Sequence, residues 1–476
     1  MAQSNVVLEN VSVNCYIVTM TMWSPQLAGR SGPRYLAIAE ALADDVANGS
    51  LPGGSRLPTH RDLAEQLGVT VGTVSRDYAE AARRGLLSGE VGRGTFVRGV
   101  SATPDAAGPI DLSQNHPPDP AGQPQRRALL GALASLTARS DSGGLLDYPA
   151  AGGNAADREA GAAWISRAGV EARPEEVLVC TGSQHGLLVL LATLLEPGGL
   201  LLAESLTYAG LKAVAALLHL RLRGLSMDAH GLRPDALEAA CRETGAKAAY
   251  LIPTLQNPTT AVMPEARRRE IVEVARRHGL ALVEDDVHGL LPERRPPPLA
   301  ALAPERTYYL TSTSKTLAPG LRIAYVKAPA ARVPRLAANL RASTWAVAPL
   351  TAAIASAWIR DGSADTLLAA RRAEARARQA LAAERLAGPD VDVHPEAYSL
   401  WLRLPEPWRA ETFAAEARQR GVLVTPAEAF SLDRDPVVHA VRVCTGAART
   451  REALALGLDV VAELLAGGAA AGTPIV

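Results

Sequence analysis

The sequence predicts an α/β protein in two parts, in which a small helical module precedes a large domain built on a mostly parallel β-sheet. From about residue 110 to residue 465, short apolar runs typical of buried strands alternate with helical patterns. Such alternation is typical of a parallel sheet with helices on both faces. Between residues 33 and 98 the chain has three helical patterns followed by two short strand patterns. The two parts of the chain therefore belong to different kinds of fold.

Composition excludes several classes of protein. The chain has 476 residues, 48% of them hydrophobic, and its 49 basic residues balance 49 acidic residues. This composition is typical of two or three folded domains and excludes a disordered tail protein. The four cysteines lie far apart with no pair at C-x-x-C spacing, so neither a zinc site nor a disulfide framework is expected. A reducing cytoplasm fits this cysteine usage, and we expect no bound metal.

Neither a membrane span nor a signal peptide is expected. The most apolar stretch, residues 186–203, is interrupted by Glu196-Pro197-Gly198-Gly199, which predicts a helix, a turn and a strand. Residues 1–32 lack the basic start, apolar core and cleavage site of a signal peptide, and we expect a disordered arm there. Because regular patterning begins only near residue 33, Met20 or Met22 is a candidate biological start. Residues 466–476 are expected to form a flexible tail.

The first module contains three helical patterns. The first is apolar along one face and stops at Asn48-Gly49. A second helix is expected to begin after the capping residue Thr59 and to run to about Leu67. Gly68 makes a turn, after which Thr70 can cap a third helix. Two helices joined by a turn of this length predict a helix-turn-helix whose second helix can enter a DNA major groove.

The side chains expected to face DNA lie on the third helix and on a short wing. Thr70, Thr73 and Arg76 lie on the polar face of that helix, and residues 86–97 are expected to form a two-stranded wing whose tip includes Arg93 and Gly94. Residues 56–98 contain seven arginines and five acidic residues, so charge alone does not indicate DNA. A winged helix used for protein contacts is the alternative.

Residues 33–98 resemble the winged helix of the GntR family of bacterial regulators. The resemblance is carried by four blocks in the same order and spacing: Gly53 to Thr59, Arg61-Asp62-Leu63-Ala64, Leu67-Gly68-Val69-Thr70 and Gly94-Thr95-Phe96-Val97. It implies that Arg61 and the first turn of the third helix contact DNA. Val71 and Ser75 depart from the pattern, because many members of the family have arginine there, and Arg76 is a candidate substitute.

A linker of small residues, 99–109, precedes the large domain. The runs that predict buried strands are residues 176–180, 200–203, 248–252, 280–284 and 307–310. Ligands of open parallel sheets bind beyond the carboxyl ends of the strands, and the polar motifs of this domain stand at such ends. After the first run, residues 181–186 open a helix whose free N–H groups can bind an anion such as phosphate, although a simple helix cap is the alternative.

Three further motifs follow later strands. They are Gln256-Asn257-Pro258-Thr259, Asp285-Asp286-Val287-His288 and Ser312-Thr313-Ser314-Lys315. Lys315 is one of only four lysines in the chain, and Arg322 lies seven residues beyond it. A lysine in apolar surroundings beside hydroxyls and arginine can lose its proton and form a Schiff base with an aldehyde. With phosphate donors and a carboxylate for a pyridine nitrogen, these residues are what pyridoxal 5′-phosphate (PLP) requires.

Residues 110–465 resemble a fold-type I aminotransferase domain, in which a smaller C-terminal α+β part accompanies the parallel sheet. The order of winged helix, linker and aminotransferase-like domain resembles the MocR-type subfamily of GntR regulators. The resemblance implies a homodimer with shared PLP sites. Tyr148, in the segment Tyr148-Pro149-Ala150-Ala151-Gly152-Gly153, would reach the phosphate in the neighbouring subunit.

The same resemblance implies a role for each site residue. Lys315 would be the internal aldimine lysine and Asp285 the partner of the pyridine nitrogen, and these two are the candidate catalytic residues. Tyr208 would stack on the ring, Asn257 would hydrogen-bond the ring hydroxyl, and Arg442 would clamp the carboxylate of a substrate or effector. The residues that would hold the phosphate are Ser183, Gln184, Ser312, Ser314 and Arg322. For Tyr148, Tyr208 and Arg442, ordinary core or surface roles are the alternative.

Three residues depart from the aminotransferase pattern. His288 stands where related enzymes have a tyrosine that hydrogen-bonds the ring hydroxyl, and its charge differs near neutral pH. Thr260 replaces the glycine usual after Asn-Pro-Thr, and Ala324 replaces the glycine usual two residues after Arg322. These departures threaten efficient transamination more than cofactor binding.

The sequence therefore predicts a cytoplasmic bacterial transcription regulator, associated with the nucleoid when it is bound to DNA. It would bind operator DNA through residues 33–98 and sense PLP, together with a small amino compound, through aldimine exchange at Lys315. The alternative is a PLP-dependent aminotransferase for an amino acid and 2-oxo acid pair, with a vestigial or architectural winged helix. A third hypothesis is a PLP-free scaffold in which Lys315 is idle.

Overall fold

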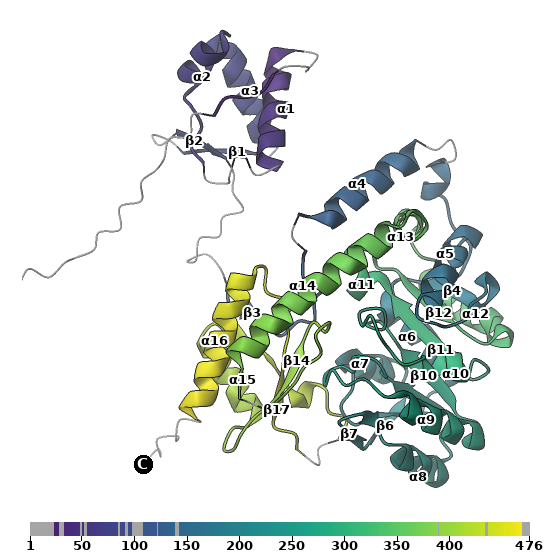
Figure 1. Cartoon of the computed structure of the whole chain (residues 1–476). Coiled ribbons are helices and arrows are strands. Elements are labelled where there is room, and N and C mark those ends of the chain that lie inside the picture. Colours follow the sequence, from purple (N-terminus) through teal and green to yellow (C-terminus); the bar gives the residue numbers. More distant parts are fainter. Residues whose placement is uncertain are drawn as a thin grey trace, which may run out of the picture. The chain divides into compact units, whose positions relative to one another are not determined.

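The structure is a computed structural model. The chain forms two compact units, and the boundary between them lies between Gly108 and Pro109 (Figure 1). It describes residues 23–27, 33–47, 50–51, 55–83, 86–90, 94–97, 108–120, 122–138, 142–388, 390–433 and 437–468. Most of the expected N-terminal arm, most of the linker and most of the C-terminal tail lie outside these ranges, and so does Arg93.

The first unit is a three-helix module with a two-stranded wing, as the sequence predicts. Its elements are α1 (Arg34–Ala47), α2 (His60–Leu67), α3 (Val71–Arg83), β1 (Leu87–Glu90) and β2 (Gly94–Val97). The three helices share a core in which Ile38, Leu63 and Val74 are completely buried. Thr59 Oγ1 accepts a hydrogen bond from the Asp62 amide at 3.3 Å, which confirms the expected cap of α2. The wing strands pair antiparallel.

The second unit is built on a seven-stranded sheet in the order β4-β12-β11-β10-β9-β5-β6. The strands are β4 (Val177–Cys180), β5 (Leu200–Glu204), β6 (Arg221–Leu225), β9 (Ala248–Leu251), β10 (Ala281–Asp285), β11 (Thr307–Ser312) and β12 (Ala324–Lys327). Among these seven strands only β12 runs in the direction opposite to the other six, so the prediction of a mostly parallel sheet is confirmed. Most side chains of the central strands are buried, as expected for a sheet covered on both faces.

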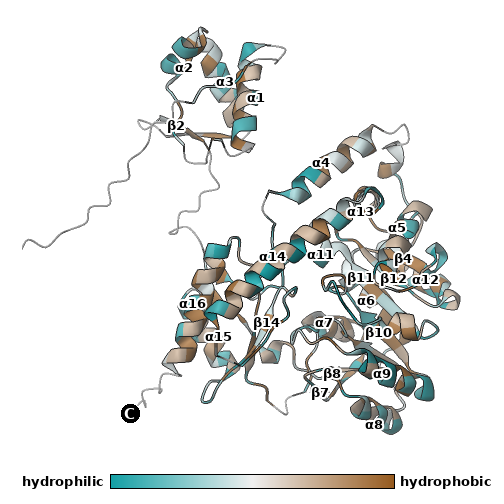
Figure 2. Ribbon diagram, in the orientation of Figure 1, coloured by the Kyte–Doolittle hydropathy of each residue, from teal (hydrophilic) through white to brown (hydrophobic). Residues whose placement is uncertain are grey.

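Helices cover both faces of this sheet. One face packs against α6 (Gly182–Leu194), α7 (Ala209–Leu217) and α12 (Val333–Thr344). Covering the other face are α5 (Ala155–Ser166), α8 (Pro234–Thr244), α9 (Glu265–His278), α10 (Leu299–Leu302) and α13 (Pro349–Asp361). Figure 2 shows hydrophilic residues along α8 and α9 beside hydrophobic strands. This arrangement follows from the amphipathic pattern of the helices, since each buries its apolar face against the strands.

A smaller C-terminal part contains an antiparallel sheet and two helices, as the sequence resemblance implies. Its sheet has the order β13-β14-β17-β16, formed by Val391–Asp392, Leu400–Arg403, Ala440–Val443 and Thr425–Pro426. The long helix α14 (Ser363–Arg385) leads into this part and packs beside α16 (Arg451–Gly467), whereas α15 (Ala410–Gln419) contacts α16 and β17 (Figure 1).

The residues that follow the linker belong to this C-terminal part. β3 (Ile110–Asp111) pairs in parallel with β15 (Val422–Leu423). The chain then passes Leu112, whose carbonyl accepts the Cys444 amide at 2.7 Å. Shorter elements complete the unit: α4 (Pro124–Thr137), α11 (Thr313–Thr316), β7 (Met227–Asp228), β8 (Gly231–Leu232) and 3₁₀ turns at 142–146, 174–176, 319–321, 330–332 and 427–429.

No helix within the described ranges is both long enough and apolar enough to span a bilayer. In the same ranges no group of three histidine, cysteine or acidic side chains is arranged to bind a metal ion.

Candidate functional site

A cavity of about 420 Å³ lies where the carboxyl ends of β4, β9, β10 and β11 meet the C-terminal part. It brings together ten of the residues singled out from the sequence: Ser183, Gln184, Tyr208, Asn257, Asp285, His288, Ser314, Lys315, Arg322 and Arg442. All of them except Arg442 lie at or beyond the ends of strands of the seven-stranded sheet, and the carboxyl edge is where open parallel sheets bind ligands. Two predicted residues, Ser312 and Tyr148, do not line it.

One end of the cavity can bind an anion. Helix α6 begins at Gly182, whose φ is +79°, and a Cβ atom there would collide with the Arg322 guanidinium. Only glycine therefore lets the guanidinium approach the helix N-terminus this closely. Ser314 Oγ is buried and has no hydrogen-bond partner among the described residues. Amide groups of a helix N-terminus, a guanidinium and hydroxyl groups together favour a phosphate.

Ser312 contributes indirectly. It is completely buried, and its hydroxyl accepts a hydrogen bond from the Ser314 amide at 3.3 Å as the N-cap of α11. The structure therefore places Ser312 behind the cavity wall, where it fixes the turn that carries Ser314 and Lys315.

Lys315 points toward the segment that follows the linker, because its Nζ donates a hydrogen bond to the Asn115 carbonyl. Burial lowers the pKa of Lys315 to about 8, and the neighbouring guanidinium groups of Arg442 and Arg322 act in the same direction. With such a pKa about a tenth of the lysine is neutral at pH 7, far more than for an ordinary lysine, and only the neutral amine can attack an aldehyde.

Asp285 is the last residue of β10 and is almost completely buried. Tyr250 Oη donates a hydrogen bond to Asp285 Oδ2 at 2.6 Å, and the Val287 amide donates to Oδ1 at 3.3 Å. Burial raises the pKa of Asp285 to about 6, although the Tyr250 hydrogen bond acts in the opposite direction. The carboxylate is therefore charged at neutral pH and faces the cavity.

His288, which stands in the position of the expected tyrosine, is buried and neutral. Burial lowers its pKa to about 3, and the charges of Lys315 and Arg442 also act to lower it. Its Nε2 lies 3.4 Å from Asn115 Nδ2, and its Nδ1 has no hydrogen-bond partner among the described residues. A neutral imidazole can either donate or accept a hydrogen bond, depending on its tautomer.

Arg442 lies on β17 and faces the cavity from the C-terminal part. Its Nη1 donates to Asn257 Oδ1 at 2.8 Å and its Nη2 to the Ser113 carbonyl at 2.6 Å. The guanidinium carbon lies 4.7 Å from the centre of the Phe430 ring. A guanidinium that lies over an aromatic ring and is oriented by hydrogen bonds is suited to binding a carboxylate through two hydrogen bonds.

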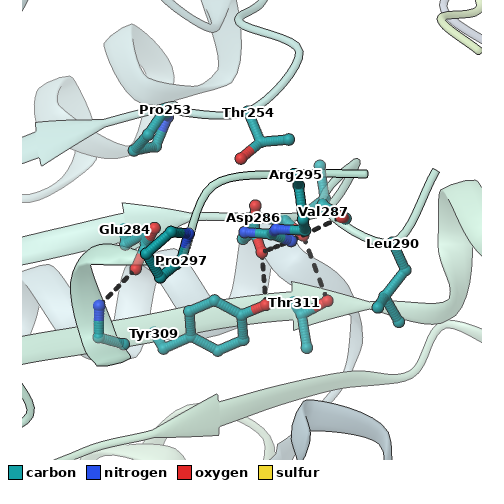
Figure 3. Close-up of polar contacts among 12 residues, drawn as sticks. Pro253, Thr254, Glu284, Asp286, Val287, Leu290, Arg295, Pro297, Tyr309 and Thr311 are labelled. Atoms are coloured by element: carbon teal, nitrogen blue, oxygen red, sulfur yellow. Dashed lines mark hydrogen bonds and ion pairs between the residues drawn. The ribbon is translucent and has the colours of Figure 1, made fainter. Parts of the chain in front are cut away.

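Behind the cavity, the residue after Asp285 belongs to a buried ionic network (Figure 3). Asp286 Oδ2 accepts hydrogen bonds from Arg295 Nη1 at 2.6 Å and from Tyr309 Oη at 2.5 Å. The Thr311 hydroxyl donates to the Asp286 carbonyl at 3.3 Å. Glu284, on the same strand, accepts the backbone amides that open α10. Asp286 thus anchors the loop that carries His288.

The sequence did not single out every residue that contacts these groups. Tyr250 was identified only as part of a strand, although a tyrosine in an otherwise aliphatic buried run is a signal for a hydrogen bond. Ser113 and Asn115 contact Arg442 and Lys315 through backbone carbonyls. A backbone contact has no side-chain signature, so no sequence pattern could have revealed it.

Tyr148 lies elsewhere on the surface. It is 89% exposed, Leu146 beside it is 91% exposed, and the Trp345 ring contacts it edge-on with 5.9 Å between ring centres. We refer to Leu146, Tyr148 and Trp345 as the Tyr148 patch. An apolar surface of this kind marks a protein contact more often than a small-molecule site.

In the first unit, an exposed face of α3 carries the residues expected to meet DNA. Val71 is 44% exposed, Thr70 and Arg76 are exposed, and Thr70 Oγ1 lies 2.9 Å from Thr73 Oγ1. Arg61 is exposed on α2. Gly94, at the start of β2, has a φ of +121°, which glycine adopts readily.

The chain matches two protein families in different parts of its sequence. Residues 107–461 match aminotransferase class I and II, and residues 34–97 match bacterial regulatory proteins of the gntR family. The uncharacterized HTH-type transcriptional regulator YdeF of Bacillus subtilis (strain 168) is 32% identical, over 93% of this chain and 96% of its own length. The vitamin B6 salvage pathway transcriptional repressor PtsJ of Salmonella typhimurium is 27% identical, over 89% of this chain and 96% of its own.

Solved aminotransferases share the fold of the second unit. The α-aminoadipate aminotransferase LysN of Thermus thermophilus, complexed with N-(5′-phosphopyridoxyl)-L-leucine, superimposes with a TM-score of 0.67 and 27% identity. The superposition covers 75% of this chain and 92% of LysN.

Proposed function

Since this chain belongs to the MocR-type regulators, in which a GntR-family helix-turn-helix domain is fused to an aminotransferase class I and II domain, we propose that it regulates transcription in response to PLP. Residues 33–98 would bind operator DNA and residues 110–465 would bind the cofactor. One observation carries the proposal: a cavity with an anion cradle, Lys315 and Asp285 exists in a chain that also presents an exposed recognition helix. We place its action in the cytoplasm, on the nucleoid.

PLP, the cofactor of this aminotransferase family, fits the cavity. Lys315 would bond to its aldehyde and Asp285 would face its ring nitrogen. Tyr208 would stack on the ring, while Asn257 and His288 would lie near the ring hydroxyl. The phosphate would bind in the cradle formed by Ser183, Gln184, Ser314 and Arg322 at the N-terminus of α6. When bound, PLP supplies an aldehyde that condenses with amines and a ring that withdraws electrons.

Covalent attachment of PLP is expected to accelerate as the pH rises from 7 to 9 and then to level off. Only the neutral amine attacks, and because the pKa of Lys315 is about 8, its neutral fraction rises about tenfold over that interval. Stopped-flow absorbance after mixing protein with PLP measures the rate. An ordinary lysine, with a pKa of about 10.4, would instead give a rate that still rises about sevenfold between pH 9 and 10, and that result would contradict the assignment.

The effector is proposed to be a small amino compound that carries a carboxylate. Arg442 offers two guanidinium nitrogens beside the cavity that contains Lys315, and its Nε has no hydrogen-bond partner in the described part of the chain. Such a compound would present its amine toward the cofactor and its carboxylate toward Arg442. Its binding would compete with the Ser113 carbonyl for Arg442.

The direct test measures DNA affinity with and without cofactor at one fixed salt concentration. The protein first selects its preferred sites from a random DNA library, and the selected fragment then serves as the probe. We expect the dissociation constant of the cofactor-free protein to change at least about fivefold when PLP is added, which corresponds to a coupling of about 1 kcal/mol. Equal affinities with and without PLP would refute the sensing half of the proposal.

A working aminotransferase is the second candidate, because Lys315, Asp285 and Arg442 line one cavity. Two departures argue against efficient turnover, namely a neutral His288 in place of a phenol and Thr260 in a left-handed conformation with a φ of +63°. Amino-group transfer from common amino acids to 2-oxo acids at about 1 s⁻¹ or faster would favour this candidate.

We further propose that the protein is a homodimer that buries the Tyr148 patch, with Tyr148 reaching the partner's cofactor phosphate. Three large apolar side chains that are exposed together are costly to leave in water. Tyr148→Asp is therefore expected to weaken the dimer and give monomers in sedimentation equilibrium at micromolar concentration. Leu456→Asp, at a 62% exposed leucine on α16, is the control and should leave the mass unchanged. Monomeric wild-type protein would contradict the proposal.

A further inference from the structure

Two consecutive aspartates at the end of β10 each accept a hydrogen bond from a buried tyrosine on a neighbouring strand. Tyr250 on β9 donates to Asp285 at 2.6 Å, and Tyr309 on β11 donates to Asp286 at 2.5 Å (Figure 3 shows the second pair). Consecutive side chains on a strand point to opposite faces of the sheet. Asp285 accordingly lines the cavity, whereas Asp286 contacts Arg295 behind it.

The two carboxylates differ in how their charge is compensated. Asp286 forms a buried ion pair with Arg295. Asp285 forms no ion pair within the described part of the chain, and Tyr250 is the one side chain there that donates a hydrogen bond to it. Hydrogen bonds to a charged, buried group are stronger than those between neutral groups. The Tyr250 phenol therefore has a larger effect on the charge of Asp285 than Tyr309 has on Asp286.

The other titratable groups around Asp285 are Glu204 at the end of β5, Tyr208 at the start of α7, Lys315 on α11 and Asp286 itself. Burial raises the pKa of Glu204 to about 8, so this carboxyl group is mostly neutral at pH 7 and adds little negative charge. Lys315 opposes protonation of Asp285 and Asp286 favours it.

We propose that Tyr250 is a positioning residue of the cofactor site, which fixes Asp285 Oδ2 and holds that carboxylate in its charged form so that the cofactor's ring nitrogen keeps its proton. This inference rests on the proposed binding of PLP. Without the phenol the carboxylate becomes the stronger base, and the shared proton moves from the ring nitrogen to Asp285. The net charge of the site is unchanged by that transfer, but the ring loses its capacity to withdraw electrons.

The test compares Tyr250→Phe with Tyr309→Phe, since both remove one phenol oxygen from a completely buried tyrosine bonded to an aspartate. PLP labelled with ¹⁵N in its ring is bound to each protein, and the ¹⁵N chemical shift distinguishes a protonated ring nitrogen from a neutral one. In Tyr250→Phe we expect the signal to move toward the neutral form at pH 7, and the PLP dissociation constant to rise about tenfold. Tyr309→Phe should keep the wild-type signal, although its melting temperature falls.

Each outcome has a distinct meaning. If wild-type protein binds no PLP, the proposed function fails. If wild type binds PLP with a protonated ring nitrogen and Tyr250→Phe gives the same signal and an affinity within twofold, only the role of Tyr250 is refuted. An equal shift in both variants would also refute it, since the effect would then be a general consequence of lost packing.

A second variant covers the case in which Tyr250→Phe does not fold. Placing 3-fluorotyrosine at position 250 makes the phenol more acidic and therefore a stronger hydrogen-bond donor. The ring nitrogen should then hold its proton to a higher pH than in the wild type. An unchanged or lower midpoint in the pH dependence of the ¹⁵N shift would overturn the inference.

Discussion

Replacing Lys315 with alanine is expected to abolish the covalent attachment of PLP completely. The chain has only three other lysines, and none of them lines the cavity: Lys212 donates to backbone carbonyls of residues 428 and 431, Lys247 is exposed, and Lys327 ends β12. No other lysine can therefore take over the bond to the aldehyde. Visible absorption before and after borohydride reduction, followed by mass spectrometry, measures the attachment.

The matched control is Lys247→Ala, which removes an exposed lysine and should leave the absorption band, its loss on reduction and the mass increase of the protein unchanged. In Lys315→Ala, PLP is expected to leave the operator affinity unaltered. A borohydride-stable adduct in Lys315→Ala would contradict the assignment of this lysine. Loss of the adduct with a retained response of DNA binding to PLP would show that noncovalent binding is sufficient for the switch.

Val71→Asp is expected to weaken operator binding about a hundredfold without unfolding the first unit. Val71 lies 44% exposed in the first turn of α3, and the first residues of a recognition helix contact the bases. A carboxylate placed there meets the negative potential of the phosphates, and like-charge contacts in an interface cost several kcal/mol. A gel-shift titration with the selected DNA fragment measures the loss, and thermal unfolding verifies the fold.

Ala82→Asp provides the control for this variant. Ala82 is exposed on the same helix, eleven residues further along and therefore about 16 Å away. The Ala82→Asp substitution introduces the same charge near the far end of α3, where we expect at most a few-fold loss of operator affinity. Equal losses in the two variants would indicate a general effect of net charge and would argue against recognition through the first turn of α3.

The elements that could be predicted from the sequence are those set by local chemistry. The cap at Thr59 and the turn at Gly68 depend on neighbouring residues, and both occur where the pattern places them. Asp285 ends a strand and Lys315 and Arg322 follow one, and the carboxyl ends of parallel strands necessarily meet at one edge of a sheet. Local sequence patterns were therefore sufficient to identify most of the candidate residues that line the cavity.

Features that depend on strand order could not be predicted. β12 lies antiparallel between β4 and β11, an order that no local pattern encodes. The partner of Asp285 follows from the same order, because Tyr250 reaches it only when β9 and β10 are neighbours. Tyr148 was expected to reach the phosphate of a neighbouring subunit, and within one chain it lies on the surface.

Thr260 was recognised from the sequence as a departure, and the structure gives it a physical meaning. Its φ is +63°, a left-handed conformation that is rare for a β-branched residue and costs about 1–3 kcal/mol. The Thr260 hydroxyl donates to the Asp392 carbonyl at 3.5 Å, so the side chain contacts the C-terminal part of the unit. A glycine would relieve the strain and lose this contact.

The pairing of β3 with β15 limits where such a chain can be cut and rejoined. Ile110 and Leu112 pack against Gly457 of α16, where a Cβ atom would lie 3.0 Å from Leu112. The strand β3, which directly follows the linker, is thus part of a core whose other elements lie more than three hundred residues further along the chain. A recombination event that exchanges the DNA-binding module must fall before residue 109 to leave the cofactor domain intact. Gene fusion upstream of that point could attach a different operator specificity in a single step, without any compensating change in the domain that it joins.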